Sequence, residues 1–150
     1  MTFYGTVVFI HIFSAIIGMG PGFILTIVAK TGNTMTELRH SYKIRKKLHM
    51  FVMIGGLLLL ITGLTMGFLN TILFHMGWYV TSLVLFLIAL AMGPVVLGPA
   101  SKPINALLES HKGEEIPEEY YRLSKILFRC EHFENGIFIV IIALMILKPF

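Results

Sequence analysis

The stretch "LHMFVMIGGLLLLITGLTMGFL", Leu48–Leu69, decides the fold, because it contains no Asp, Glu, Lys or Arg. A helix needs about 20 apolar residues to cross the roughly 30 Å hydrocarbon core of a bilayer. Three further apolar runs of this kind cover about 3–29, 78–97 and 128–147. Their apolar residues are continuous rather than alternating, which favours helices over barrel strands. The sequence therefore predicts an all-α, four-helix transmembrane bundle that forms one integral membrane domain over residues 1–150.

The composition agrees with a membrane protein. The chain is 56% apolar and only 13% charged, with a mean hydropathy of +0.83. Soluble domains carry about 25% charged residues. The lipid bilayer is therefore the expected partner, and we expect a multi-pass protein of the cell membrane, in a bacterium the inner membrane.

Basic residues predict the orientation, because Lys and Arg concentrate in cytoplasmic loops. The loop between the first two spans and the loop between the last two are basic, whereas the short loop 70–77 has no Lys or Arg. Both long loops are therefore expected in the cytoplasm and both termini outside. The basic stretch "KIRKKLH" (43–49) has no aromatic platform beside it, so we expect headgroup anchoring and no nucleic-acid binding.

The fourth helix is expected to begin before its apolar run. Pro117 suits the first turn of a helix, and Glu118 and Glu119 suit the positive end of the helix dipole. We therefore expect a helix of about 30 residues, from near Pro117 to Lys148.

An internal repeat divides the chain into two helix pairs. The tripeptide Met-Gly-Pro occurs late in the first span, at residues 19–21, and again in the third, at 92–94. Each copy precedes a basic loop and a helix with a histidine near its inner end, His49 or His132. Both pairs have the same orientation, so the bundle is predicted to consist of two parallel repeats. The glycines would either frame a cleft or allow close helix packing.

The histidine pair suggests a cofactor. Two imidazoles facing each other across a cleft, His49 and His132, would suit a six-coordinate haem b. Glycines opposite them, Gly20 and Gly93, would leave room for the flat ring. Three cationic side chains near the same face could bind the propionates, namely Lys46, Lys47 and Arg129.

Other polar residues in the spans are also candidates. His11 lies about 10 Å into the first span. An ionisable residue there is either a functional candidate or a hydrogen-bond partner of a nearby carbonyl. His11 is also a third possible metal ligand. Glu131, Glu134 and Asn135 share one face of the fourth helix and could relay protons or support an imidazole ligand. They could equally be solvated at headgroup level.

Two segments carry a resemblance to known families. "HIFSAIIGMG" (11–20) followed by "LHMFVMIGGLLLLITG" (48–63) resembles the four-helix membrane proteins related to membrane-bound protoporphyrinogen oxidase and to the copper-resistance membrane domain. The chain is more similar still to an uncharacterised family of bacterial four-span proteins. The resemblance implies haem-dependent oxidation of a porphyrinogen, with His11 and His49 as important positions. The Met-Gly-Pro repeats and the polar fourth span depart from the oxidase pattern.

Three functions follow as hypotheses. The first is a haem-binding membrane protein in electron transfer or a membrane-linked oxidoreductase step. The second is a small proton- or metal-coupled transporter or channel subunit with its polar site at the inner end of span four. The third is a non-catalytic assembly subunit. Because four short helices enclose little interior, a homodimer is also compatible with the sequence.

Overall fold

The computed structural model describes residues 2–150, and these form helices and connecting turns without any strand. The long helices are α1 (Phe3–Ala29), α2 (Met35–Leu69), α3 (Gly77–Met92), α4 (Gly98–Ser110) and α5 (Glu118–Leu147). A 3-10 turn, η1 (Thr71–His75), precedes α3, and a π turn, η2 (Gly93–Leu97), joins α3 to α4. Four segments are long and apolar enough to cross a membrane, so the predicted all-α bundle is confirmed.

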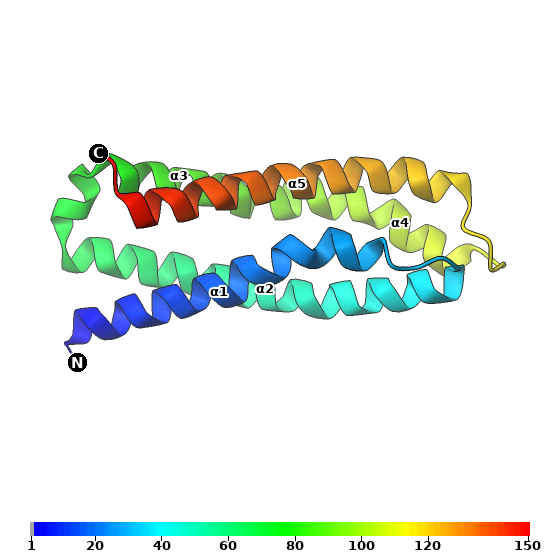
Figure 1. The fold of residues 1–150 in the computed structure, drawn as a ribbon, viewed down its shortest axis with the longest axis horizontal. Helices are drawn as coiled ribbons and strands as arrows, with labels where there is room; N and C mark the ends of the chain where they lie inside the picture. Colours follow the sequence, from blue (N-terminus) through cyan, green and yellow to red (C-terminus); the bar gives the residue numbers. More distant parts are fainter. Residues whose placement is uncertain (1) are drawn as a thin grey trace.

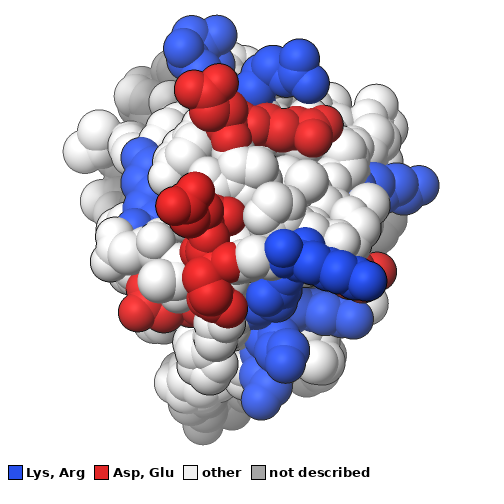
Figure 2. Space-filling view, turned by 90° about the vertical axis from the view of Figure 1, so that its right-hand side faces the viewer, with Lys and Arg blue, Asp and Glu red and all other residues white. Residues whose placement is uncertain are grey.

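The helices form two antiparallel pairs that lie side by side (Figure 1). The pair α1–α2 lies along one side, and α5 with the α3–α4 rod lies along the other. Both termini lie at one end of the bundle, and the α1–α2 and α4–α5 connections lie at the other end (Figure 1). We refer to the end with these two basic connections as the inner end. Figure 2 is a view along the bundle onto this inner end, with Lys, Arg, Asp and Glu side chains distributed over it.

The helix ends follow from local capping. α1 covers 3–29 as predicted, whereas α2 begins at Met35, well before the predicted Leu48. The Thr34 hydroxyl accepts from the Glu37 N–H, and the Glu37 carboxylate accepts from the Asn33 N–H. This reciprocal cap starts the helix in the basic loop. α5 begins at Glu118 behind Pro117, which confirms the expected early start of the last helix.

The third span is longer than predicted. It continues from α3 through the π turn into α4 and ends at Ser110, instead of ending near Leu97. Pro94 has no N–H to donate to the preceding turn, and the Gly98 N–H instead pairs with the Gly93 carbonyl across the wider turn. Pro21, in contrast, remains inside the regular helix α1. The two Met-Gly-Pro copies therefore differ in backbone structure.

Close glycine packing joins α1 to α2. A Cβ atom on Gly18 would lie 2.8 Å from the carbonyl carbon of Gly55, and a Cβ on Gly55 would overlap the Gly18 backbone. Gly20 and Gly93, in contrast, have nothing within 4 Å of their Cβ positions. At the crossing of α1 and α2, the glycines thus allow backbones to touch, as in other membrane helix pairs.

Two apolar clusters fill the bundle. The inner cluster combines residues of α1, α2, α4 and α5: Ala29, Met35, Leu38, Tyr42, Ile104, Leu108, Tyr120 and Leu127. The second cluster combines residues of α1, α2, α3 and α5: Met19, Leu59, Phe86, Ala89, Phe138 and Ile141. The region between these clusters carries the polar groups described next.

Candidate functional site

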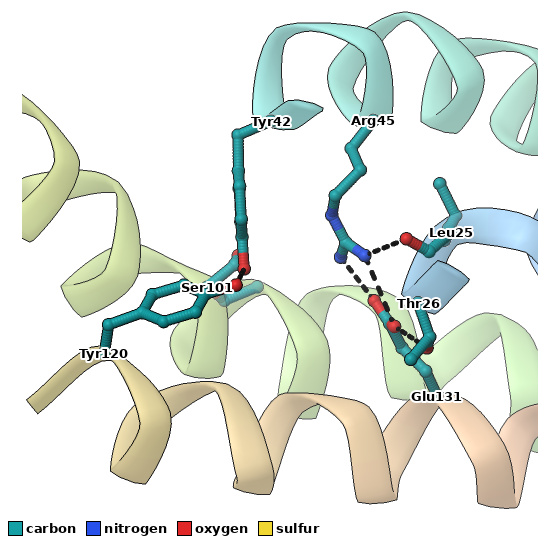
Figure 3. Close-up of polar contacts among 8 residues, drawn as sticks. Leu25, Thr26, Tyr42, Arg45, Ser101, Tyr120 and Glu131 are labelled. Atoms are coloured by element: carbon teal, nitrogen blue, oxygen red, sulfur yellow. Dashed lines mark hydrogen bonds and ion pairs between the residues drawn. The ribbon is translucent and has the colours of Figure 1, made fainter. Parts of the chain in front are cut away.

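A buried ion pair crosses the bundle near its inner end. Nη2 of Arg45, on α2, lies 2.5 Å from Oε1 of Glu131, on α5. Both side chains are nearly inaccessible, with 11% and 5% of their surfaces exposed. Figure 3 shows the two side chains reaching toward each other from opposite helices. The pair thus places two opposite charges between the two helix pairs.

Helix α1 completes this polar cluster. The Thr26 hydroxyl donates to Oε2 of Glu131 over 2.5 Å, and Nη1 of Arg45 donates to the Leu25 carbonyl over 2.6 Å (Figure 3). Nη1 also lies 3.4 Å from Oε2 of Glu131, so the guanidinium approaches both carboxylate oxygens. A buried charge is tolerated when it is paired and hydrogen-bonded in this way. We name Thr26, Arg45 and Glu131 the inner triad.

Aromatic hydroxyls extend the cluster toward the inner end. The Tyr42 ring centroid lies 5.1 Å from Cζ of Arg45, a cation–π arrangement. The Tyr42 and Tyr120 hydroxyls are 3.4 Å apart, and their rings meet edge to face. The buried polar groups therefore run from the inner triad toward the basic connections at the inner end.

Helical periodicity brings Arg45 and Glu131 inside. Buried positions on the inner part of α2 are spaced by three and four residues, namely 35, 38, 42 and 45. Those on α5 are spaced likewise, at 120, 124, 127 and 131. Such spacing defines one face of a helix. Glu131 was among the predicted site residues, whereas Arg45 was counted only as a basic loop residue, and the spacing of Met35, Leu38 and Tyr42 is the signal that could have identified it.

Glu134 and Asn135 lie one turn further toward the outer end on α5, and both are half-buried. Oδ1 of Asn135 lies 3.7 Å from the Cβ position of Gly22, so the amide faces α1. Among residues 2–150, no side-chain hydrogen bond or ion pair involves the Glu134 carboxylate. Glu134 is therefore a half-buried carboxyl group beside the triad without a side-chain partner among the described residues.

His11 occupies the outer half of the bundle. Its Nδ1 lies 2.9 Å from the Thr62 hydroxyl oxygen, and that hydroxyl lies 2.7 Å from the Leu58 carbonyl oxygen. The Thr62 hydroxyl has one proton and donates it to the Leu58 carbonyl, so its oxygen accepts a hydrogen bond from the His11 imidazole. In the neutral ring, this assignment puts the imidazole proton on Nδ1 and leaves a lone pair on Nε2.

A small cavity of about 30 Å³ adjoins His11. It is lined by residues of all four spans, including His11, Gly63, Tyr79, Ser82, Ile141 and Met145. The Ser82 hydroxyl is buried and has no partner among the described residues. A space this size is sufficient for a water molecule or a single ion.

The structure does not bring the predicted haem ligands to one cavity. His49 and His132 are both exposed. His132 and Arg129 line an inner groove of which His49 is not part. Lys46 and Lys47 are exposed on α2.

The predicted metal ligands are also dispersed. Within the part of the chain that the structure describes, no three His, Cys, Asp or Glu side chains are grouped to bind a metal ion. Of the predicted site residues on α5, Glu131 contacts Arg45 and Thr26, with Glu134 and Asn135 one turn away, whereas Arg129 and His132 line the groove.

Comparison with known families supports the membrane assignment. Residues 5–149 match the family model described as "Predicted integral membrane protein (DUF2269)". No curated protein and no solved structure matches the chain. The match covers nearly the whole sequence and agrees with four apolar helices long enough to span a bilayer. The chain therefore belongs to the DUF2269 family of predicted integral membrane proteins.

Proposed function

We propose that this protein is a small proton-coupled membrane carrier or channel subunit, with its polar site at the inner end of the fourth span. The observation that carries the proposal is the inner triad, a buried Arg45–Glu131 pair with Thr26 across three helices, with Glu134 beside it. Ionisable groups inside a membrane bundle are costly, and they typically mark ion pathways or proton relays.

The two carboxylates have different roles in this proposal. Glu131 is held by a guanidinium and a hydroxyl, so it is a fixed anion that closes the inner end of the bundle. Glu134 has no such partner within residues 2–150, so it is the group that takes up a proton and releases it again. Proton coupling has more support than metal coupling, because residues 2–150 place no group of three His, Cys, Asp or Glu side chains together at the inner end.

His11 gives the outer half a second proton acceptor. Its free Nε2 and the unpaired Ser82 hydroxyl belong to the same small cavity, which has room for water. A proton entering from outside would reach His11 first and Glu134 later, while the inner triad separates Glu134 from the cytoplasm. Opening would require Arg45 and Glu131 to part.

Proton flux into proteoliposomes tests this proposal. Purified protein is reconstituted with a pH-sensitive dye inside, and a potassium diffusion potential drives protons inward. We expect flux above that of empty vesicles, at least tenfold lower in Glu134→Gln. The matched control is Glu119→Gln, because Glu119 is an exposed α5 carboxylate paired with Arg122 at 3.8 Å. Wild-type flux equal to that of empty vesicles, or full flux in Glu134→Gln, would overturn the proposal.

A redox protein is the second candidate, and His11 is the observation that favours it. An imidazole with Nδ1–H held by a hydrogen bond and Nε2 free is the form that ligates haem or a metal ion. Met145 of α5 lines the same cavity, and a thioether is a soft ligand for copper(I) or an axial ligand for haem. About 30 Å³ accommodates an ion but not a haem ring, so haem binding would require the helix pairs to separate.

The visible spectrum separates the two haem arrangements. A haem b between His49 and His132 stays a prediction, and it requires a Soret band that each of His49→Ala and His132→Ala abolishes. A haem on His11 requires a band that only His11→Ala abolishes. Purified protein without a Soret band would exclude both arrangements.

A further inference from the structure

A groove of about 510 Å³ opens at the inner end between α1 and α5. The C-terminal end of α1 and the following turn form one wall, with Lys30 and Asn33. The inner half of α5 forms the other wall, with Lys125, Phe128, Arg129 and His132. This groove lies outside the inner triad, none of whose members lines it.

The groove is positively charged. Three cationic side chains line it, Lys30, Lys125 and Arg129, and no Asp or Glu does. Within residues 2–150, none of these three forms an ion pair. Lys125 and Arg129 are four residues apart on α5, and like charges at this spacing destabilise a helix. An anion bound between them would remove this repulsion.

Neutral donors accompany the charges. The Asn33 amide and the Tyr121 hydroxyl belong to the lining. Nζ of Lys30 lies 5.5 Å from the Phe128 ring centroid, which positions the ammonium beside α5. Cationic and neutral donors around one open groove match a phosphate group, which offers several acceptor oxygens.

The location of the groove identifies the source of that phosphate. α1 ends at Ala29, and the apolar part of α5 begins near Phe128, so the groove lies where the bilayer core meets the inner headgroups. Further toward the bilayer centre, Ile27 on α1 and Phe133 on α5 are exposed. A lipid can therefore place its headgroup in the groove and its chains against these apolar side chains. Basic sites between helices on the cytoplasmic side bind anionic lipid headgroups.

From this arrangement we infer that the α1–α5 groove is a binding site for the phosphate of an anionic phospholipid of the inner leaflet. Lys125 and Arg129 neutralise the phosphate, Lys30 holds it from α1, and Asn33 and Tyr121 donate hydrogen bonds. The bound lipid would lie at the α1–α5 interface. It is independent of proton transport, because it uses neither Glu134 nor the inner triad.

Lipid binding by the full-length protein tests this inference. The protein in mild detergent is titrated with dioleoylphosphatidylglycerol or dioleoylphosphatidylcholine, and bound lipid is counted by native mass spectrometry. We expect preferential binding of phosphatidylglycerol, weakened at least tenfold in Lys125→Gln/Arg129→Gln. The control is Lys43→Gln/Lys47→Gln, which removes two exposed cations at the same spacing from α2, outside the groove. Inorganic phosphate is added as a competitor in a separate arm.

Three results would overturn the inference. Equal binding of both lipids would show that the groove does not recognise the anionic headgroup. Equal weakening in the α2 control would show an effect of net charge alone. Displacement of phosphatidylglycerol by millimolar phosphate would identify a site for free anions. If the α5 double variant loses its helical circular dichroism, the single variants Lys30→Gln and Lys125→Gln replace it, with an additive loss expected.

Discussion

Arg45 and Glu131 are 86 residues apart in the chain, yet Nη2 and Oε1 of their side chains are 2.5 Å apart. The pair connects α2 of one helix pair to α5 of the other, and Thr26 connects α1 to the same carboxylate. Within a bilayer, apolar burial contributes little to helix association, and packing and polar contacts contribute more. The inner triad is therefore expected to be a main contact between the two halves of the bundle.

Removing one charge of this pair should destabilise the fold. In Arg45→Met, the Glu131 carboxylate remains buried without its cation, and breaking a buried pair in this way costs about 3–5 kcal/mol. We expect a loss of this size in the free energy of unfolding. The measurement is titration of mixed micelles with sodium dodecyl sulfate, followed by circular dichroism.

Replacing both charges separates stability from function. Arg45→Met/Glu131→Leu removes the unpaired charge, so most of the stability lost in Arg45→Met should return. If the inner triad also closes a proton path, this double variant should fold normally yet show altered proton flux. A double variant as unstable as Arg45→Met would contradict the interpretation of the pair as one coupled unit.

The Thr26 hydroxyl should contribute measurably to the free energy of unfolding. Thr26→Val keeps the shape of the side chain and removes the donor to Glu131, and hydrogen bonds to charged groups are worth about 1.5–3 kcal/mol. Thr65→Val is the matched control, because the Thr65 hydroxyl donates to the Ile61 carbonyl at an exposed site. We expect the control to change the free energy of unfolding by less than about 0.5 kcal/mol. Equal effects of the two variants would argue against a special role for Thr26.

The fold could be predicted because bilayer thickness constrains it strongly. Continuous apolar runs predicted the number and order of the spans correctly. The orientation that the distribution of Lys and Arg predicts stays a prediction. The helix ends were harder, because α2 starts at a cap formed by Thr34 and Glu37 in a loop that composition alone describes as basic and polar. The extension of the third span depends on the π turn at Gly93–Leu97, which a hydropathy pattern does not contain.

Of the two charged residues in the candidate site, only Glu131 could be predicted from the sequence. Glu131 lies within the predicted fourth span, where a charge is conspicuous, whereas Arg45 is surrounded in sequence by Lys43, Lys46 and Lys47. Only the helical phase of Met35, Leu38 and Tyr42 distinguishes Arg45 from its exposed neighbours. The pairing of His49 with His132 rested on sequence similarity between the two halves. It could not account for the exposure of both side chains.

Helix packing at Gly55 gives a further prediction. A Cβ atom there would overlap the backbone of Gly18, so α1 and α2 must separate in Gly55→Ala. Overpacking of this kind typically costs about 1–3 kcal/mol. The control is Gly136→Ala on α5, where nothing lies within 4 Å and alanine should gain up to about 1 kcal/mol from helix propensity. Opposite signs in micelle unfolding would support the packing role, and a neutral Gly55→Ala would contradict it.

The tautomer of His11 can be read directly from nitrogen chemical shifts. Because the Thr62 hydroxyl donates to the Leu58 carbonyl, it can only accept from the imidazole, which fixes the proton on Nδ1. We expect the ¹⁵N spectrum of histidine-labelled protein to show a protonated Nδ1 and an unprotonated Nε2 for the resonance that His11→Ala removes. Thr62→Ser should keep this tautomer, whereas Thr62→Val removes the hydroxyl acceptor and should end the preference for it. A protonated Nε2 in the wild type would leave no free lone pair on His11, and both the proton-acceptor and the metal-ligand roles of His11 would then fail.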